Sequence, residues 1–327
     1  MLRVASFLLS CGLAGLTSMA ATAGLAQSAV APTTVAPVTV QAPAKPKVIE
    51  KQAHSFVESH AAVPNPEVGQ FGRWRDPVCV EVVGLPRAED AATIKRRIES
   101  VARAVGLPAA GARCTANVEV VFSDQPQQVM NLVAQRRQYL LGYHHVHEHD
   151  RLKAVTRPIQ SWYVTASQGN GFGVGPLLFS EVPISIQNRT KVIDDPDNAP
   201  PVGCANSRIS SSCLQSEFAN VFIVADSKAL NGKPAGLVAD YLVMLALSQP
   251  RSLAGCEALP SVIDLFASSP CTGREPPDGL TPADAAYLTA LYATDLEAKR
   301  AVEQSDIAGR MARILVKANA PARQVSP

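Results

Sequence analysis

The sequence predicts an α+β fold in which helices pack on a β-sheet and the domain is disulfide-stapled. Three observations predict this class. Strand-like apolar runs alternate with helix-spaced apolar positions over residues 79–140, and a strand-like run at 220–225 precedes an apolar helix. In addition, six cysteines follow an N-terminal segment that is typical of exported proteins.

The composition excludes two classes of protein. The 327 residues are 47% hydrophobic, and 30 Lys and Arg side chains stand against 28 Asp and Glu side chains. Intrinsic disorder requires low hydrophobicity and high net charge. A nucleic-acid-binding protein requires an excess of basic side chains to neutralise phosphates. We therefore expect a folded chain with no nucleic-acid partner.

The first 26 residues, 1–26, have the order of a secretory signal peptide. Arg3 is the only charge, an apolar run covers 4–16, and small residues follow it. The apolar run is too short to span a bilayer. Cleavage fits after three alanines, of which we favour the last, so that Gln27 becomes the N-terminus: Ala20, Ala23 and Ala26.

Beyond the signal peptide the sequence predicts a soluble, exported chain. No later apolar run reaches 18 residues without a charge, so we expect no transmembrane segment in the mature protein. Cys11 lies within the apolar run and is interpreted as part of the signal rather than as a lipoprotein site, because it is too near the start. The expected location is the periplasm or the outside of the cell.

The other six of the seven cysteines are expected to form disulfides, because an exported protein meets an oxidising environment. Their order along the chain favours local pairs: Cys79 with Cys114, Cys204 with Cys213, and Cys256 with Cys271. Six cysteines allow 15 pairings, so other connectivities stay open. Zinc binding is the alternative, but the sequence contains no C-x-x-C pair.

Residues 27–72 are expected to form a tether and a short N-terminal segment. The stretch 27–51 is rich in Pro, Ala and Val and has no aromatic residue, which favours an extended chain without a core. A short helix is expected over 54–63, with His54 and His60 on its surface. One α+β domain is expected over 73–318.

Within that domain the periodicity predicts the elements in order. The expected strands cover 79–83, 117–122, 161–166 and 220–225. The expected helices cover 94–105, 129–140, 237–247 and 281–317, the last opening at a Thr281 N-cap and broken near Ser305. The basic triplet 95–97 is interpreted as a solvated helix face. Residues 319–327 are expected to be a disordered tail.

Four of the six histidines lie in the segment 144–150. Imidazoles this dense can bind a transition metal, with His145, His147 and His149 as the candidate ligands and Asp150 as a possible fourth. However, the spacing does not fit H-E-x-x-H, which would require a histidine in place of Arg151. The alternative is an exposed polar loop between a helix and a strand.

The usual catalytic signatures are missing from the sequence. It contains neither G-x-S-x-G nor S-x-x-K, and paired cysteines are not nucleophiles. We therefore expect no catalytic residue and no cofactor.

The C-terminal half resembles a family of exported bacterial proteins with a metallopeptidase-like, zincin-type fold. The resemblance rests on the order of four segments in the sequence and extends over most of residues 75–315: the strand 220–225, the helix 236–247, the segment 259–264 (LPSVID) and the segment 280–284 (LTPAD) leading into Leu291 and Tyr292. The chain as a whole is also similar to secreted proteins of alphaproteobacteria. The resemblance implies a zincin-like mixed sheet with packed helices and a helical C-terminal part.

In zincins this helix carries H-E-x-x-H, whose histidines bind zinc and whose glutamate activates the metal-bound water. Here the resemblance places Ala239 and Val243 at the histidine positions and Asp240 at the glutamate position. Neither Ala nor Val can donate an electron pair to a metal. The resemblance therefore implies a scaffold without its catalytic metal, in which Asp240 is a buried acid that needs a structural partner.

Three functions stay open at this stage. The first is a non-catalytic, zincin-like binding or envelope-associated factor, with an envelope protein or a peptide as its ligand. The second is a metal-dependent hydrolase that uses the cluster at 144–150. The third is a structural module of the cell envelope.

Overall fold

The computed structural model describes residues 45–63, 69–142, 144, 146–169, 185–186, 189–190, 192–193, 214–267, 269–296 and 298–319. The expected signal peptide, residues 27–44 of the expected tether, and residues 320–327 therefore lie outside the described residues. Within them no helix is long and apolar enough to cross a membrane.

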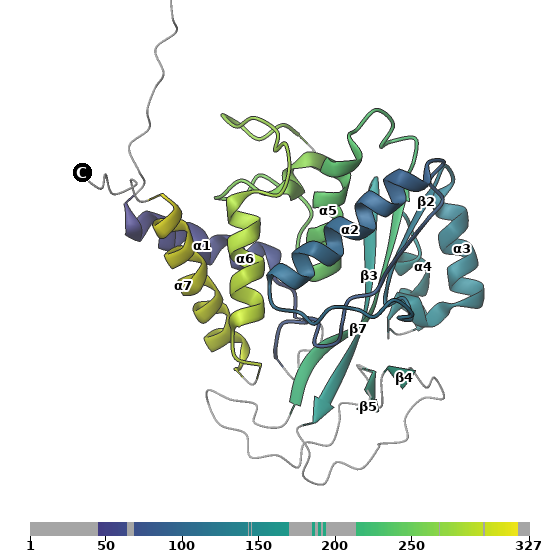
Figure 1. Cartoon of the computed structure of the whole chain (residues 1–327), viewed down its shortest axis with the longest axis horizontal. Coiled ribbons are helices and arrows are strands. Elements are labelled where there is room, and N and C mark those ends of the chain that lie inside the picture. Colours follow the sequence, from purple (N-terminus) through teal and green to yellow (C-terminus); the bar gives the residue numbers. More distant parts are fainter. Residues whose placement is uncertain are drawn as a thin grey trace, which may run out of the picture. The chain divides into compact units, whose positions relative to one another are not determined.

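The described residues form α-helices and strands in a mixed arrangement (Figure 1). The helices are α1 (Pro46–His60), α2 (Ala88–Ala104), α3 (Pro126–Arg136), α4 (His149–Leu152), α5 (Ala235–Leu247), α6 (Pro282–Ala293) and α7 (Arg300–Ala318). The strands are β1 (Val80–Val83), β2 (Val118–Ser123), β3 (Ile159–Gly169), β4 (Ser185–Ile186), β5 (Arg189–Thr190), β6 (Val192–Ile193) and β7 (Leu214–Asp226). Three 3-10 helices, η1 (Gln138–Leu141), η2 (Val146–Glu148) and η3 (Val262–Phe266), complete the set.

The main sheet has the strand order β1-β2-β7-β3-β6. Strands β1, β2 and β7 are parallel, whereas β3 runs antiparallel to both β7 and β6. The expectation of a mixed sheet with packed helices is confirmed at this level. Apolar side chains alternate along β2, where Val118, Val120 and Phe122 are buried, because successive residues of a strand point to opposite faces.

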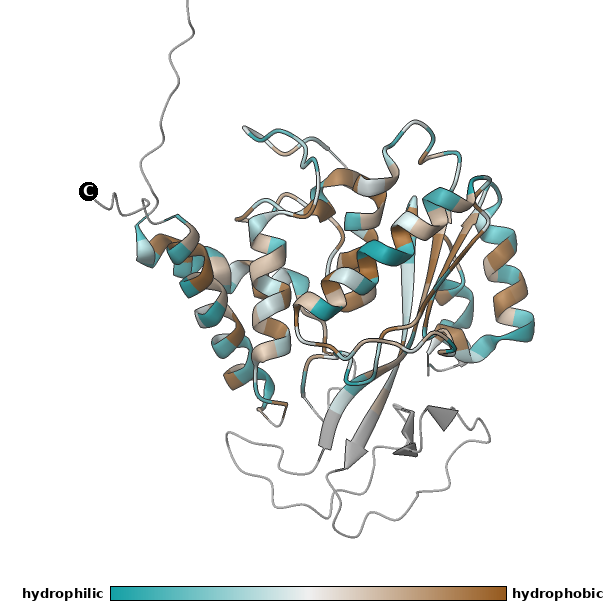
Figure 2. Ribbon diagram, in the orientation of Figure 1, coloured by the Kyte–Doolittle hydropathy of each residue, from teal (hydrophilic) through white to brown (hydrophobic). Residues whose placement is uncertain are grey.

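Both faces of the sheet are covered. On one face, buried residues of α2 and α5 pack on β2 and β7, and α1, α6 and α7 extend the same core. On the other face, Met130 and Val133 of α3 pack with Leu140, Trp162 and Phe222. Figure 2 shows alternating teal and brown bands on α2, α3 and α7, as expected for helices with one apolar face.

The folded unit begins upstream of the expected boundary at residue 73. Helix α1 starts at Pro46, which fits the first turn of a helix. Its buried residues recur at helical spacing and lie in the main core: Ile49, Ala53, Phe56, Val57 and His60. The expected tether thus gives way to a packed helix about six residues earlier than the composition suggested.

The expected helix break near Ser305 was wrong, because Ser305 lies inside α7. The helical part is interrupted between Ala293 and Arg300 instead. Arg73 explains the position of the break. Its side chain is only 2% exposed, and the guanidinium donates to the carbonyls of Leu291, Thr294 and Asp295 at the end of α6. The same group forms an ion pair with Glu303 of α7, so one buried cation ends α6 and positions α7.

Two expected disulfides are present, Cys79–Cys114 and Cys256–Cys271. The third expected pair, Cys204–Cys213, lies outside the described residues. The first bridge joins the residue before β1 to the loop before β2, and the second closes the loop that carries η3.

Candidate functional site

The helix that the resemblance aligns with the zinc helix of zincins is α5. Every residue from Val238 to Leu247 is buried, because all of them except Asp240 are apolar or aromatic and α5 packs against α2 within the main core. Ala239 and Val243 have no exposed surface. At these two positions α5 therefore faces the core.

Asp240 uses both of its carboxylate oxygens within the fold. Its Oδ1 accepts a hydrogen bond from Nε of Arg97 at 2.5 Å, and its Oδ2 accepts one from the backbone N–H of Leu280 at 2.9 Å. A Cβ at Gly279 would lie 2.8 Å from Oδ2, so glycine permits this approach. The carboxylate joins α2, α5 and the segment that precedes α6, which is the structural role expected for a buried acid.

The basic triplet 95–97 is not purely a solvated helix face, because Arg97 has a buried partner. The three side chains 95–97 are exposed, as expected of a solvated face. Arg97, with 43% of its side chain exposed, nevertheless reaches inward to Asp240. A long side chain can place its stem on the surface and its guanidinium on a partly buried acid.

A second polar cluster joins α1, η3 and α6. Ser261 donates its hydroxyl hydrogen bond to Oδ1 of Asp284 at 2.6 Å, and its Oγ lies 3.2 Å from Nε2 of His60. Asp284 also accepts hydrogen bonds from the backbone of Val262 and from both the backbone and the side chain of Thr281. All three members, His60, Ser261 and Asp284, are at most 1% exposed.

This cluster contains the residue types of a serine-hydrolase triad in a different order. In a triad the histidine lies between the serine and the acid, so that the serine can attack a substrate. Here the hydroxyl of Ser261 lies between the histidine and the acid, accepts the N–H of Ile263 and has no exposed surface. The arrangement therefore caps η3 and α6 and anchors α1 rather than presenting a nucleophile.

Burial sets the protonation of this cluster. Desolvation lowers the pKa of His60 to about 4, against a smaller opposing effect of its hydrogen bond to the carbonyl of Phe56. Burial also raises the pKa of Asp284, although the hydrogen bonds that it accepts oppose this shift. The ring of His60 stacks on that of Phe56 with 3.7 Å between centroids. The expectation that His60 is a surface residue was wrong, because it points into the core.

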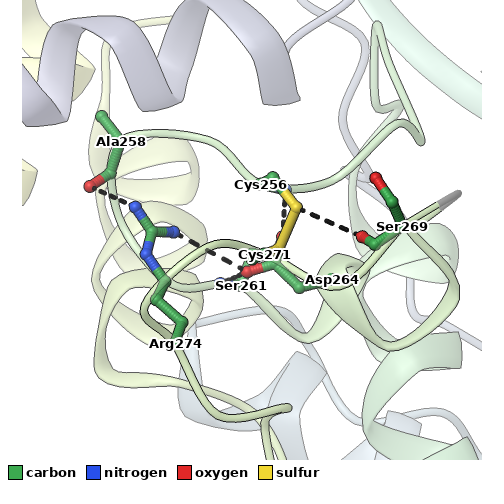
Figure 3. Close-up of a disulfide and its surroundings, with 7 residues drawn as sticks. All are labelled: Cys256, Ala258, Ser261, Asp264, Ser269, Cys271 and Arg274. Carbon is green, nitrogen blue, oxygen red and sulfur yellow. Dashed lines mark hydrogen bonds and ion pairs between the residues drawn. A yellow bond between two sulfur atoms is a disulfide. The ribbon is translucent and has the colours of Figure 1, made fainter.

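The loop 249–261 connects this cluster to the second disulfide. Asp264 accepts a hydrogen bond from the backbone of Cys256 at 2.6 Å and one from the backbone of Ser261 at 3.2 Å. Figure 3 shows Arg274 on the other side, where its Nη2 donates to the carbonyl of Ala258 at 3.2 Å and its Nη1 lies 3.9 Å from Asp264. One carboxylate therefore organises both ends of the disulfide loop.

The described part of the histidine-rich segment forms two short helical turns between η1 and β3. His147 and His149 lie in η2 and α4, and the imidazoles of His144 and His149 are stacked with 5.7 Å between centroids. His145 lies outside the described residues. In the part of the chain that the structure describes, no group of three or more His, Cys, Asp and Glu side chains could hold a metal ion.

Described residues line a groove and a pocket. A groove of about 610 Å³ lies between α1 and α7 and is lined by charged and small residues that include Glu50, His54, Asp306 and Arg313. A pocket of about 400 Å³ lies at the carboxyl ends of β2 and β7, where the first turn of α3, the segment 155–158 and Asp226 meet.

Comparison of the chain with models of protein families, with curated proteins and with solved structures found no match.

The sequence predicted that Asp240 needs a partner but could not identify Arg97, which is 143 residues away. It missed the buried cluster of His60, Ser261 and Asp284. The one signal for it was the spacing of Phe56, Val57 and His60, which places all three on the same apolar stripe as Ile49 and Ala53.

Proposed function

We propose that the protein is an exported, non-catalytic binding or envelope-associated factor built on a zincin-like scaffold. One observation carries the proposal: the position that would activate water in a zincin is held by Asp240, whose two oxygens are already bound by Arg97 and Leu280. The paired cysteines support an oxidising location.

The residues of α5 do not fit a zinc ion. A catalytic zinc requires His, Cys, Asp or Glu ligands around an open coordination position. Ala239 and Val243 offer no ligand atom and are fully buried. We therefore derive no metal-dependent step at α5.

The test is the metal content of the mature protein purified without chelators. We expect substoichiometric zinc by elemental analysis and no peptidase activity on unfolded protein substrates. An equivalent of zinc that is lost on chelation together with a peptidase activity would overturn the proposal.

The pocket at the carboxyl ends of β2 and β7 is the proposed position for a ligand, because ligands of open α/β sheets commonly bind at that edge. Hydrogen bonds hold the residues that line this pocket in place. Gln127 donates to the carbonyl of Lys153 and accepts from the backbone of Val155, and Nη1 of Arg157 donates to the carbonyl of Leu253. Arg157 then offers further N–H groups to a carboxylate, such as the C-terminus of a peptide.

This position can be tested by peptide binding. We expect a peptide with a free C-terminal carboxylate to bind more tightly than its amidated form, and Arg157→Gln to remove the difference. Arg151→Gln, an exposed arginine whose partner is Glu148, is the matched control. Equal binding of both peptide forms by the wild-type protein would exclude this pocket as a carboxylate site.

The second candidate function is a metal-dependent hydrolase using His145, His147 and His149. The density of histidines in this segment favours it, and the ring centroids of His144 and His149 lie 5.7 Å apart there. Replacing the three candidate histidines by Ala should abolish tight nickel or zinc uptake, while His54→Ala should leave it unchanged. Equal uptake by the wild-type protein and the triple variant would exclude this function.

A further inference from the structure

The two described disulfides differ in how solvent reaches them. Cys271 and Cys114 are both half-buried, but Cys256 is exposed whereas Cys79 is only 4% exposed. Thiol–disulfide exchange requires that an attacking thiolate reach a sulfur atom, so access largely decides which bridge reacts. From this difference and from the contacts described below, we propose that Cys256–Cys271 is a thiol–disulfide exchange site for a dithiol-bearing partner, and that its oxidation state controls how firmly α1 is held.

The bridge fixes the backbone of its own loop. Gly255 and Cys256 both have a positive φ, 73° and 62°, and Cys256 is the only described non-glycine residue with this conformation. A left-handed conformation is unfavourable for a residue with a Cβ, so surrounding contacts must hold it. Here those contacts are the disulfide and the hydrogen bond from the backbone of Cys256 to Asp264.

The loop held in this way contacts α1 directly. Gln52 donates to the carbonyl of Ala258 at 3.5 Å, and the backbone of Ser252 donates to the carbonyl of Ser59 at 3.1 Å. Next to these contacts His60 meets Ser261, whose backbone N–H binds Asp264. The contacts therefore run from the bridge through Asp264 and Ser261 to the C-terminal half of α1.

A dithiol can reduce the Cys256–Cys271 bridge in two exchange steps. One thiolate of the dithiol attacks Sγ of Cys256, the more exposed residue of the pair, and the S–S bond breaks so that Cys271 leaves as a thiolate and takes up a proton. The second thiol of the dithiol then attacks the mixed disulfide. It releases Cys256 as a thiol, and two electrons have passed from the dithiol, now a disulfide, to the protein.

Reduction removes the covalent constraint on the loop that covers one side of α1. The contacts of α1 with α7 remain, so we expect α1 to open locally while the sheet stays folded. This inference does not depend on the proposed binding function, because it rests on the loop and α1 alone.

The test uses the full mature protein and dithiothreitol as the probe. After mild reduction and alkylation, mass spectrometry should show Cys256 and Cys271 modified at least ten-fold faster than Cys79 and Cys114. Amide hydrogen exchange over 46–60 should then rise at least ten-fold, with exchange in α2 unchanged. Modification of Cys79 and Cys114 first, or unchanged exchange in α1 after reduction of Cys256–Cys271, would overturn the proposal.

Two double variants serve as matched controls. C256S/C271S should show the fast exchange of α1 without any reductant, and C79S/C114S should show normal exchange of α1 that still responds to dithiothreitol. If C256S/C271S does not fold, Ser261→Ala provides the second measurement, because it cuts the contact path while the bridge stays oxidised. Exchange of α1 as slow in Ser261→Ala as in the wild-type protein would contradict the path described above.

Discussion

His60 is a residue whose burial makes stability depend on pH. Its pKa is lowered from 6.5 to about 4 in the folded protein. Above pH 6.5 the imidazole is neutral in both the folded and the unfolded chain, so it has no effect on the free energy of unfolding. As the pH falls from 6.5 to 4 the unfolded chain takes up the proton first, and stability is lost.

We therefore predict that His60 costs the fold about 3 kcal/mol between pH 6.5 and pH 4, from the pKa difference at about 1.4 kcal/mol per pH unit. His60→Gln should remove this part of the pH dependence, and His54→Gln, on the same helix, should retain it. Urea unfolding of the three proteins between pH 7.5 and pH 4 measures the effect. Parallel pH profiles for the wild-type protein and His60→Gln would contradict it.

Arg73 and Glu303 are a buried ion pair, and burial raises the pKa of Glu303 to about 7 although Arg73 opposes the shift. Removing one partner leaves the other charge buried and unpaired. We predict that Arg73→Met lowers the free energy of unfolding by about 3–5 kcal/mol. The same change at Arg310, whose pair with Asp306 is about one third exposed, should cost less than about 1 kcal/mol.

A second substitution tests whether the unpaired charge of Glu303 causes the loss of stability in Arg73→Met. In the Arg73→Met background, Glu303→Gln should recover part of the lost stability, because it removes the uncompensated charge. Chemical unfolding of the single and double variants gives both values. A double variant less stable than Arg73→Met alone would show that the effect comes from packing and not from charge.

At the scale of single elements, the capping of α6 is the feature that the sequence predicted best. Thr281 and Asp284 form a capping box, in which each side chain accepts the backbone N–H of the other residue. Thr281→Ala should cost about 1–2 kcal/mol, because a buried cap is lost. Thr289→Ala, an exposed change on the same helix, should stay within about 0.5 kcal/mol. Equal thermal midpoints for the two variants would contradict the role of the cap.

The elements that the sequence predicted share a strong local signal. Strands β2 and β7 have β-branched apolar residues, and α5 is apolar on all sides, so local periodicity sufficed. Helix α1 was placed too late, because its first turn contains Pro46, Lys47 and Val48 and continues the composition of the preceding segment. The contacts of Asp240 and His60 depend on residues far away in the sequence, which no local pattern can identify.

At the scale of the whole molecule, α1 belongs to the folded unit. It buries Ile49, Phe56 and Val57, each of which contributes about 1.5–3 kcal/mol, in a domain whose total stability is about 5–15 kcal/mol. We predict that a chain starting at residue 45 unfolds cooperatively with the same melting temperature as a chain starting at residue 27. A chain starting at residue 73 should lose cooperative unfolding. Calorimetry of both chains tests where the folded unit begins. A cooperative transition in the shorter chain would show that the folded unit begins at residue 73.

The packing of α1 on α7 also has a consequence for the order of folding. Residues 46–60 pack mainly on residues 300–318, and their other partners, the loop 249–261 and Tyr287, also come late in the sequence, so the apolar face of α1 stays unpaired until these residues have been synthesised. Contacts of such long sequence separation slow folding and place it late. A nascent chain of this design therefore leaves residues 46–60 without their packing partners until residues 249–318 have been synthesised.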